Sequence, residues 1–438
     1  MTYAEAVARL LALRGGEYAG MRPGLARMDS LLAALGYPER RYALAHVGGT
    51  NGKGSVAAML ATMLRAGGRR VGLYTSPHLC SFRERIRVAG APIPQDAVVD
   101  GVEALGTLVA RLDATMFEAT TALALDHFAR EEVEIAVLEV GLGGRLDATT
   151  VGAPAATVIT RVDLDHEAVL GHSLAEIAAE KAAIIRAGVA VTAAQAPEAM
   201  AVIERRDAAV GVPLAREGHE LSVRVRSRDL EGQRIDCAGP DWALADLRLA
   251  LRGTFQPSNA LLAVAAARHL GVPEPAIRNG LTRVRWPGRF EVLDGDPRLV
   301  LDGAHNPGGA RALADSLREL FPGEAITLVV GVSRDKDLHG ILGALAPVAR
   351  RLILTGFGNP RAADPEALRA CLPPTEAPVE MARSAAEALA LALDARRTPI
   401  VCVAGSLFLV GDVLTALRGG RDNTCSIEKG ADSMESLF

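Results

Sequence analysis

The chain has 438 residues, of which 49% are apolar, 23% charged and 4% aromatic, and its formal net charge is −4. This length predicts about two domains, and the composition is typical of a soluble globular enzyme, not of a disordered or fibrous protein. The charge excludes a general attraction to nucleic acid or to an anionic membrane, so any anionic substrate must be bound by a local group of side chains.

Cysteine usage and the apolar segments indicate the cellular setting. The five cysteines are scattered and form no C-x-x-C pair, so neither a disulfide framework nor a zinc site is expected. Glu5 and Arg9 interrupt the first apolar segment, and no later segment approaches the roughly 18 apolar residues of a membrane span. We expect a cytoplasmic monomer without a signal peptide, a membrane helix or a nucleic-acid partner.

In the first 200 residues, helical periodicity alternates with apolar strands. Helices are predicted over residues 3–14, 27–35, 56–64, 97–130 and 174–187. Strands are predicted over residues 42–47, 70–75, 134–141, 155–160 and 188–194. This alternation predicts a parallel sheet with helices on both faces and ligands beyond the carboxyl ends of the strands. The arginine-rich residues 83–87 are expected to form an ordered loop over the site, with a solvated charged turn as the alternative.

The turn after the first strand is rich in glycine and carries one lysine. Its glycines allow several backbone N–H groups to converge on one point, the following helix directs its positive end there, and Lys53 adds a full charge. A polyphosphate is therefore the expected ligand, and a plain turn between strand and helix is the alternative. The pattern G-x-x-x-x-G-K-[ST] is not met, because Gly54 stands at the hydroxyl position and Ser55 follows it.

The pattern of apolar and polar residues changes near residue 213. Short alternation over residues 213–252 predicts a small antiparallel addition. A helix follows from about residue 256, and the segment WPGR at 286–289 is typical of a hinge. Strands separated by helices then recur at residues 298–302, 326–332, 350–356 and 399–404. We expect a P-loop parallel-sheet ATPase domain over residues 1–288, a smaller Rossmann-like α/β domain over residues 289–418, and a frayed tail over residues 419–438.

Three polar residues near strand ends are candidate magnesium ligands. A bound nucleoside triphosphate needs magnesium, which prefers hard oxygen ligands. Glu139 and Ser76 supply such oxygens, and His166 could supply a nitrogen near a second ion. A hydrogen-bonded structural histidine and a satisfied buried acid remain the alternatives for His166 and Glu139.

Several blocks of the sequence match one family. They are HVGGTNGKGS at 46–55, TSPHL at 75–79, LEVGLGGRLDAT at 138–149, LDH at 164–166 with LG at 170–171, EK at 180–181, WPGRFE at 286–291 and LDGAHNP at 301–307. The chain resembles the folylpolyglutamate synthase and dihydrofolate synthase family of Mur-type amide ligases from about residue 27 to residue 412. The shifted GKGS is that family's own form.

The resemblance implies an ATP-dependent ligase that joins L-glutamate to a folate-type carboxylate through an acyl phosphate. The implied substrates are dihydropteroate or reduced folates and L-glutamate, with ATP and one or two Mg²⁺ ions. The implied ATP-binding residues are Gly49, Thr50, Asn51, Gly52, Lys53, Gly54, Ser55, Gln256, Asn259, Arg289 and Asp302. The implied metal ligands are Ser76, Glu139 and His166, and the implied catalytic residues are Lys53, Lys181, Asp302 and His305.

Some implied roles have alternatives. Lys181 matches a family lysine that is often carbamylated, whereas Glu180 and Lys181 alone would indicate a helix-surface ion pair. Asp302 could also be a turn or helix cap. Ser406, in the matching C-terminal block, is the candidate for glutamate binding.

The chain departs from the family pattern at Thr150, where asparagine is usual, and at Ala183, where glycine is common. Neither change removes a phosphate or metal group, although substrate preference could change. We expect both dihydropteroate and folate to be substrates. A monofunctional folylpolyglutamate synthase and a P-loop nucleotidase or kinase are the alternatives, and a GTPase-like switch is disfavoured because no N-K-x-D motif is present.

Overall fold

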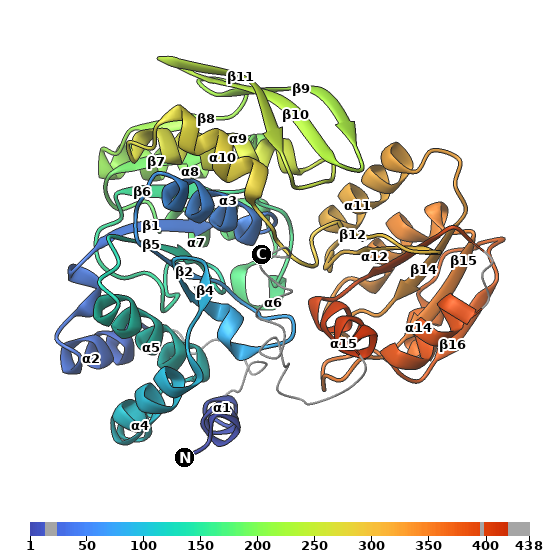
Figure 1. Ribbon diagram of the computed structural model, residues 1–438, viewed down its shortest axis with the longest axis horizontal. Coiled ribbons are helices and arrows are strands. Elements are labelled where there is room, and N and C mark those ends of the chain that lie inside the picture. The colour runs from blue at the N-terminus through green and yellow to red at the C-terminus, as the bar shows by residue number, and fades with distance from the viewer. Residues whose placement is uncertain (14–23, 395–397, 419–438) are drawn as a thin grey trace.

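The computed structural model describes residues 1–13, 24–394 and 398–418, so the predicted tail over residues 419–438 lies outside the described residues. Its strands form three sheets of eight, three and six strands. We call the eight- and three-stranded sheets with their helices the N-terminal lobe, and the six-stranded sheet with its helices the C-terminal lobe (Figure 1). The predicted mixed α/β fold, with a mainly parallel sheet followed by a second α/β unit, is confirmed.

The N-terminal lobe is built on a sheet with the order β4-β3-β2-β5-β1-β6-β7-β8. Its strands are β1 (Ala43–Gly48), β2 (Val71–Tyr74), β3 (Ile86–Val88), β4 (Ala91–Pro92), β5 (Ile135–Glu139), β6 (Ala156–Ile159), β7 (Val189–Thr192) and β8 (Leu214–Arg216). The pairs from β2 to β8 are parallel, whereas β3 is antiparallel to both β2 and β4. The central strands are buried on both faces, which explains their continuous apolar runs.

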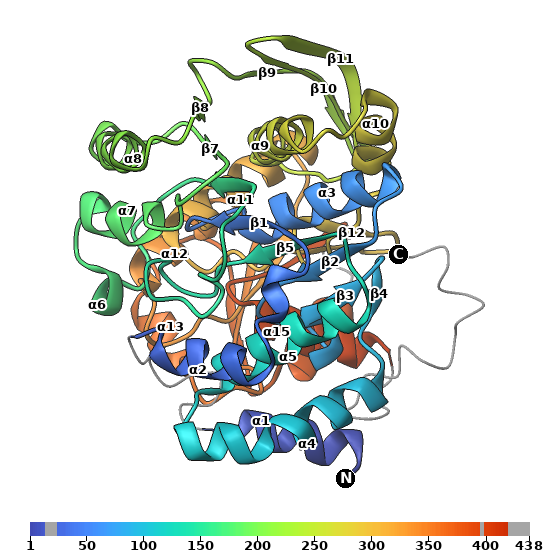
Figure 2. The ribbon, with the colours of Figure 1, turned by 90° about the vertical axis from the view of Figure 1, so that its left-hand side faces the viewer.

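Two sets of helices cover the faces of this sheet (Figure 2). The described helices of the lobe are α1 (Tyr3–Leu11), α2 (Ala26–Ala34), α3 (Lys53–Ala66), α4 (Gln95–Leu112), α5 (Met116–Arg130), α6 (Glu167–Leu170), α7 (Leu174–Ala182), α8 (Pro197–Val210), α9 (Gln256–His269) and α10 (Glu274–Arg283). Helices α3, α9 and α10 pack with Val47 and Val137 on one face, and α1, α2, α4 and α5 pack with Leu44 and Leu138 on the other. The alternation of side chains along β1 and β5 therefore supplies one core on each side.

Two local predictions for this lobe were wrong, and a third, the small antiparallel addition, is confirmed except at its first residues. Residues 83–87 form a 3₁₀ turn (Phe82–Arg85) and the start of β3, because this segment pairs with β2. Helix α7 ends at Ala182, five residues before the predicted end. Strand β8 joins the main sheet in parallel with β7, so the antiparallel addition consists of β9 (Ser222–Asp229), β10 (Gly232–Gly239) and β11 (Trp242–Leu249).

The C-terminal lobe has the strand order β12-β13-β17-β14-β15-β16. Its strands are β12 (Glu291–Leu293), β13 (Arg298–Leu301), β14 (Ile326–Val330), β15 (Arg351–Thr355), β16 (Val379–Ala382) and β17 (Ile400–Ala404). Its helices are α11 (Pro307–Leu320), α12 (Leu338–Leu345), α13 (Pro365–Ala370), α14 (Ala385–Asp394) and α15 (Leu407–Leu417). Helices α11 and α12 cover one face, and α14 and α15 cover the other. The edge strands β12 and β16, each only partly buried, were not predicted.

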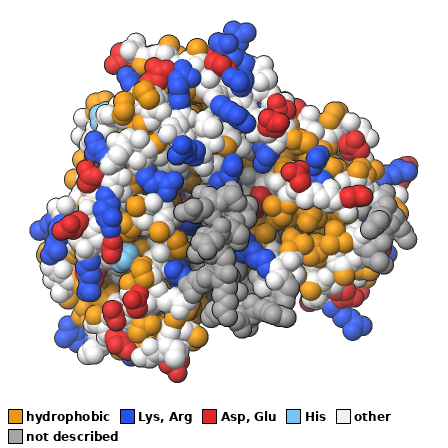
Figure 3. Space-filling model, viewed as in Figure 1, with side chains coloured by type: hydrophobic (Ala, Val, Ile, Leu, Met, Phe, Trp, Pro, Cys, Tyr) orange, Lys and Arg blue, Asp and Glu red, His pale blue; other side chains and the backbone are white. Residues whose placement is uncertain are grey.

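The surface agrees with the small net charge. On the face in Figure 3, acidic and basic side chains are interspersed over both lobes. Within the described ranges, no helix combines the length and the apolar character needed to cross a bilayer.

Candidate active site

A cavity of about 640 Å³ lies between the two lobes. The predicted residues that line it are Gly49, Thr50, Asn51, Gly52, Lys53, Gly54, Ser55, Ser76, Glu139, His166, Lys181, Asn259, Arg289, Asp302 and His305. They come from strand ends and helix starts of both lobes, as expected for ligand sites of parallel sheets. The structure therefore brings nearly all the predicted site residues to one place.

The phosphate loop, residues 49–55, joins β1 to α3. Gly49 has a φ of +134°, and a Cβ there would lie 2.0 Å from the Thr160 hydroxyl oxygen, so only glycine fits. Helix α3 begins at Lys53, which directs its unpaired N–H groups and positive end toward the cavity. The Lys53 ammonium donates to the Thr50 carbonyl over 3.0 Å, and burial lowers its pKa. The loop thus has the geometry of an anion site.

Lys181 lies behind the phosphate loop, 5% exposed. Its Nζ donates to the carbonyl oxygen of Gly49 over 3.0 Å. Burial, with the nearby positive charge of Lys53, lowers the pKa of Lys181 to about 7. Its neighbour Glu180 instead accepts from Arg145 over 2.8 Å, so the alternative of a Glu180–Lys181 surface ion pair is excluded.

The candidate metal ligands Ser76, Glu139 and His166 all line the cavity. The Glu139 carboxylate accepts from the Ser76 backbone N–H over 3.2 Å, and burial raises its pKa while Lys53 opposes that rise. Nε2 of His166 lies 3.2 Å from Nζ of Lys336. Burial, reinforced by Lys336, lowers the pKa of His166 to about 3 and keeps the imidazole neutral. Among the residues that the structure describes, no three His, Cys, Asp or Glu side chains form a ready metal site.

The donor chemistry nevertheless fits magnesium at Ser76 and Glu139. A serine hydroxyl and a carboxylate are hard oxygen donors, and both residues line the cavity beside the phosphate loop. His166 stays a predicted ligand, with its Nε2 beside an ammonium group.

Three residues of the C-terminal lobe complete the cavity. Both carboxylate oxygens of Asp302 accept backbone N–H groups, from Phe290 and Ala304 over 2.8 Å each, so this residue does cap its turn while lining the cavity. Burial raises the pKa of Asp302, and the Arg289 guanidinium opposes this rise. Nδ1 of His305 lies 2.7 Å from the Gly303 carbonyl oxygen, which makes Nδ1 the protonated nitrogen and leaves Nε2 as an acceptor. Burial, with Lys336 nearby, lowers the pKa of His305 to about 4.

Two predicted residues do not line the cavity. Gln256 is fully buried behind the loop, where its Nε2 donates to the Ser55 hydroxyl and its Oε1 accepts from Asn259, both over 3.1 Å. The Ser406 hydroxyl caps α15 by accepting from the Phe408 N–H over 3.1 Å. The roles of both residues in binding remain predictions.

Sequence reasoning missed Asp165, Asn306 and Lys336. Asp165 forms an ion pair with Lys336 and accepts from the Asn306 amide over 3.1 Å. Asp165 and Asn306 lie in the family blocks LDH and LDGAHNP, directly beside the predicted residues His166 and His305. Their position in these blocks could have marked them as site residues. Lys336 stands in the charged run RDKD, which is typical of a solvated turn.

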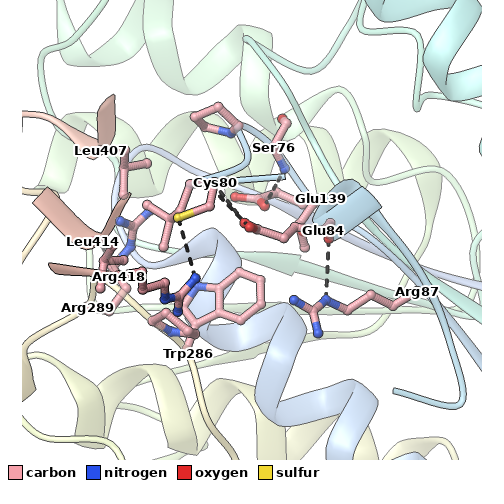
Figure 4. A pocket seen from close by; sticks show the side chains of 14 residues that line it. Ser76, Cys80, Glu84, Arg87, Glu139, Trp286, Arg289, Leu407, Leu414 and Arg418 are labelled. Carbon is pink, nitrogen blue, oxygen red and sulfur yellow. Dashed lines mark hydrogen bonds between the residues drawn. The ribbon is translucent and has the colours of Figure 1, made fainter. Parts of the chain in front are cut away.

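A second, smaller pocket of about 60 Å³ adjoins the cavity and shares Ser76, Glu139 and Arg289 with it. Figure 4 shows its wall, where the Trp286 ring lies beside the Arg418 guanidinium, which donates to the Cys80 sulfur over 4.0 Å. The Glu84 carboxylate supports this wall by accepting the N–H groups of residues 79–81. Apolar and basic side chains are thus placed next to the end of β5.

Comparison with known proteins identifies the relatives of both lobes. Residues 47–267 match the Mur ligase middle domain, and residues 288–407 match the Mur ligase glutamate ligase domain. The dihydrofolate synthase/folylpolyglutamate synthase of Bacillus subtilis is 37% identical over 78% of this chain and 83% of its own length. A probable bifunctional folylpolyglutamate synthase/dihydropteroate synthase of Halobacterium salinarum is 38% identical over 95% of this chain and 52% of its own, so the chain spans about half of that relative. The solved structure of E. coli FolC in complex with DHPP and ADP superposes with a TM-score of 0.88 at 31% identity, over 96% of this chain and 99% of that one.

Proposed function

The chain belongs to the folylpolyglutamate synthase/dihydrofolate synthase family of Mur ligases, and from this membership we propose that it joins L-glutamate to a folate-type carboxylate in an ATP-dependent reaction. The observation that carries the proposal is the shared cavity, in which Lys53, Glu139 and Lys181 of one lobe face Arg289, Asp302 and His305 of the other. A nucleotidase would need only the residues of the N-terminal lobe.

The proposed chemistry has two steps. The acceptor carboxylate attacks the γ-phosphorus of ATP, an acyl phosphate forms and ADP leaves. The amine of glutamate then attacks the acyl carbon, the amide bond forms, and phosphate leaves with the electrons of the broken C–O bond. Because little covalent catalysis is required, positioning and charge stabilisation supply most of the rate enhancement.

Each lobe contributes separate groups to these steps. In the N-terminal lobe, Lys53 and the N–H groups of the phosphate loop hold the phosphates in line. Ser76, Glu139 and His166, which line the cavity, would hold Mg²⁺, which neutralises phosphate charge when bound. In the C-terminal lobe, Arg289 contacts phosphate. Nε2 of His305 accepts an N–H of the incoming amine and directs its lone pair toward the acyl carbon.

We propose that Lys181 is carbamylated. A carbamate forms when a neutral amine attacks CO₂ and loses a proton, and a pKa of about 7 keeps about half of Lys181 neutral at that pH. The product is an anion beside the phosphate loop, where it would support a metal ion.

We propose that both dihydropteroate and reduced folates are acceptors of the glutamate. We also propose a domain boundary between residues 288 and 289. We further propose that the protein acts on small molecules as a cytoplasmic monomer, without a nucleic-acid or membrane partner. Size-exclusion chromatography with light scattering tests the monomeric state.

The decisive experiment incubates the purified protein with ATP, Mg²⁺ and radiolabelled glutamate, and offers dihydropteroate or tetrahydrofolate separately. Label incorporated into both acceptors supports the bifunctional assignment. Incorporation into tetrahydrofolate alone indicates a folylpolyglutamate synthase. ATP hydrolysis without incorporation into either acceptor would overturn the ligase assignment in favour of a nucleotidase.

A further inference from the structure

Asn306, the residue just before helix α11 of the C-terminal lobe, has a buried side-chain amide that contacts the N-terminal lobe. Asn306 caps α11, since its Oδ1 accepts from the Gly309 N–H over 2.8 Å, and the residue is only 2% exposed. Its Nδ2 donates to Oδ1 of Asn51 over 2.9 Å and to Oδ2 of Asp165 over 3.1 Å. Its Oδ1 also accepts from Nδ2 of Asn51 over 3.1 Å. Both amide protons and the oxygen are thus in use, and two of the three partners belong to the N-terminal lobe.

The partner Asn51 is a residue of the phosphate loop. Its Nδ2 donates to Oδ2 of Asp163 over 2.9 Å in addition to its contact with Asn306. The reciprocal amide pair therefore joins the loop directly to the start of α11. Buried amides that lose their partners carry a desolvation penalty, so the two side chains hold each other in place.

A second contact from the C-terminal lobe reaches the same region. Lys336, which follows β14, forms an ion pair with Asp165, the residue that also accepts from Asn306. Two separate segments of the C-terminal lobe thus converge on one carboxylate, which fixes Asp165 and the Asn306 amide relative to each other.

We propose that Asn306 is a positioning residue that couples the phosphate loop to the N-terminus of α11. His305 immediately precedes Asn306, so a displacement of the loop at Asn51 is transmitted to the imidazole that faces the cavity. The catalytic consequence rests on the proposed function: the loop would hold the phosphoryl group and His305 the amine, and the Asn51–Asn306 pair would fix their separation.

The same helix offers a matched control outside the cavity. Further along α11, Ser316 accepts the Thr254 N–H over 2.9 Å, and Glu319 forms an ion pair with Arg228 of β9. Glu319→Gln weakens a contact between the lobes on α11 without altering the amide pair.

Two substitutions of Asn306 separate its coupling from its capping role. Asn306→Asp keeps an oxygen for the Gly309 N–H, loses both amide protons and places a like charge beside Asp165. Asn306→Ser also preserves a cap and adds no charge. Thermal unfolding of each variant verifies that it folds.

Hydrogen–deuterium exchange of the segment 305–312, with and without the ATP analogue AMPPCP and Mg²⁺, tests the coupling without any acceptor. In the wild type and in Glu319→Gln, AMPPCP should slow exchange in this segment about fivefold. In Asn306→Asp and Asn306→Ser the slowing should disappear, although calorimetry still shows AMPPCP affinity within about threefold of the wild type. Equal slowing in the wild type and both Asn306 variants would overturn the proposal.

Steady-state kinetics supply the catalytic test. Asn306→Ser should lower kcat about tenfold and change the KM for ATP by less than about threefold, because positioning is lost while nucleotide contacts stay. In the double variant with Asn51→Ala, the effects of the two single changes should not multiply, whereas multiplying effects would overturn the coupling. A wild type that shows nucleotide-dependent protection but ligates no glutamate would refute the proposed function and leave the coupling intact.

Discussion

Replacing Lys181 by methionine tests the electrostatics of the site. A neutral lysine in the folded protein takes up a proton on unfolding at any pH between its folded and unfolded pKa values. The unfolded state therefore binds more protons than the folded state, and the free energy of unfolding of the wild type rises with pH across this window. Methionine keeps most of the apolar stem and removes the titrating group.

The pKa shift sets the size of the effect. The fall from 10.5 to about 7 corresponds to at most about 5 kcal/mol, since one pKa unit equals about 1.4 kcal/mol. The destabilisation of the folded wild type by the buried Lys181 charge is complete below pH 7 and vanishes near pH 10.5. Lys181→Met should therefore be more stable than the wild type at pH 7, and the difference should shrink steadily toward pH 10.

The assay is the midpoint of urea unfolding for both proteins at pH 7, 8.5 and 10, in buffers freed of CO₂. Glu180→Gln is the control, because it changes the adjacent residue, which pairs with Arg145 at the surface. A stability difference that does not vary with pH would refute the burial argument. Added bicarbonate should stabilise the wild type and leave Lys181→Met unchanged, because only a neutral amine forms a carbamate.

Three further substitutions probe the cavity. Lys53→Ala should lower kcat about a thousandfold or more, because a charge about 4 Å from the phosphoryl group contributes about 4 kcal/mol at an effective dielectric constant of 20; unchanged glutamate incorporation would refute its role. Gly49→Ala should weaken nucleotide binding at least about tenfold in calorimetry, because its Cβ would overlap Thr160, whereas Gly343→Ala, with open space around the new Cβ, should bind normally. Glu139→Gln keeps the side-chain volume but loses the charge, so the Mg²⁺ concentration for half-maximal activity should rise about tenfold or more, and an unaltered Mg²⁺ dependence would place the metal elsewhere.

The strength of each local signal decided what could be predicted from the sequence. Buried strands such as β5 are continuous apolar runs, and the phosphate loop carries its glycines and lysine within a few residues. The edge strands β12 and β16 are short and partly exposed, so neither alternation nor an apolar run marks them. Lys336 lies in a charged run that resembles a solvated turn, and its burial beside Asp165 arises only where the two lobes meet. Contacts between segments 171 residues apart in sequence leave no local pattern.

The packing of Gly54 and Ser55 explains why the hydroxyl of the phosphate loop lies one position later than in the usual pattern. Gly54 stands against the Trp286 ring, and a Cβ at this position would lie 2.8 Å from the indole nitrogen, so a serine in the usual place does not fit. The next residue, Ser55, is 1% exposed and its hydroxyl accepts from Gln256, which fixes it toward α9. A hydroxyl for magnesium can instead come from another strand end, where Ser76 follows β2 and its backbone N–H donates to the Glu139 carboxylate. The tryptophan that excludes the usual serine belongs to the segment joining the two lobes, so the form of the phosphate loop and the presence of the second lobe are linked by direct contact.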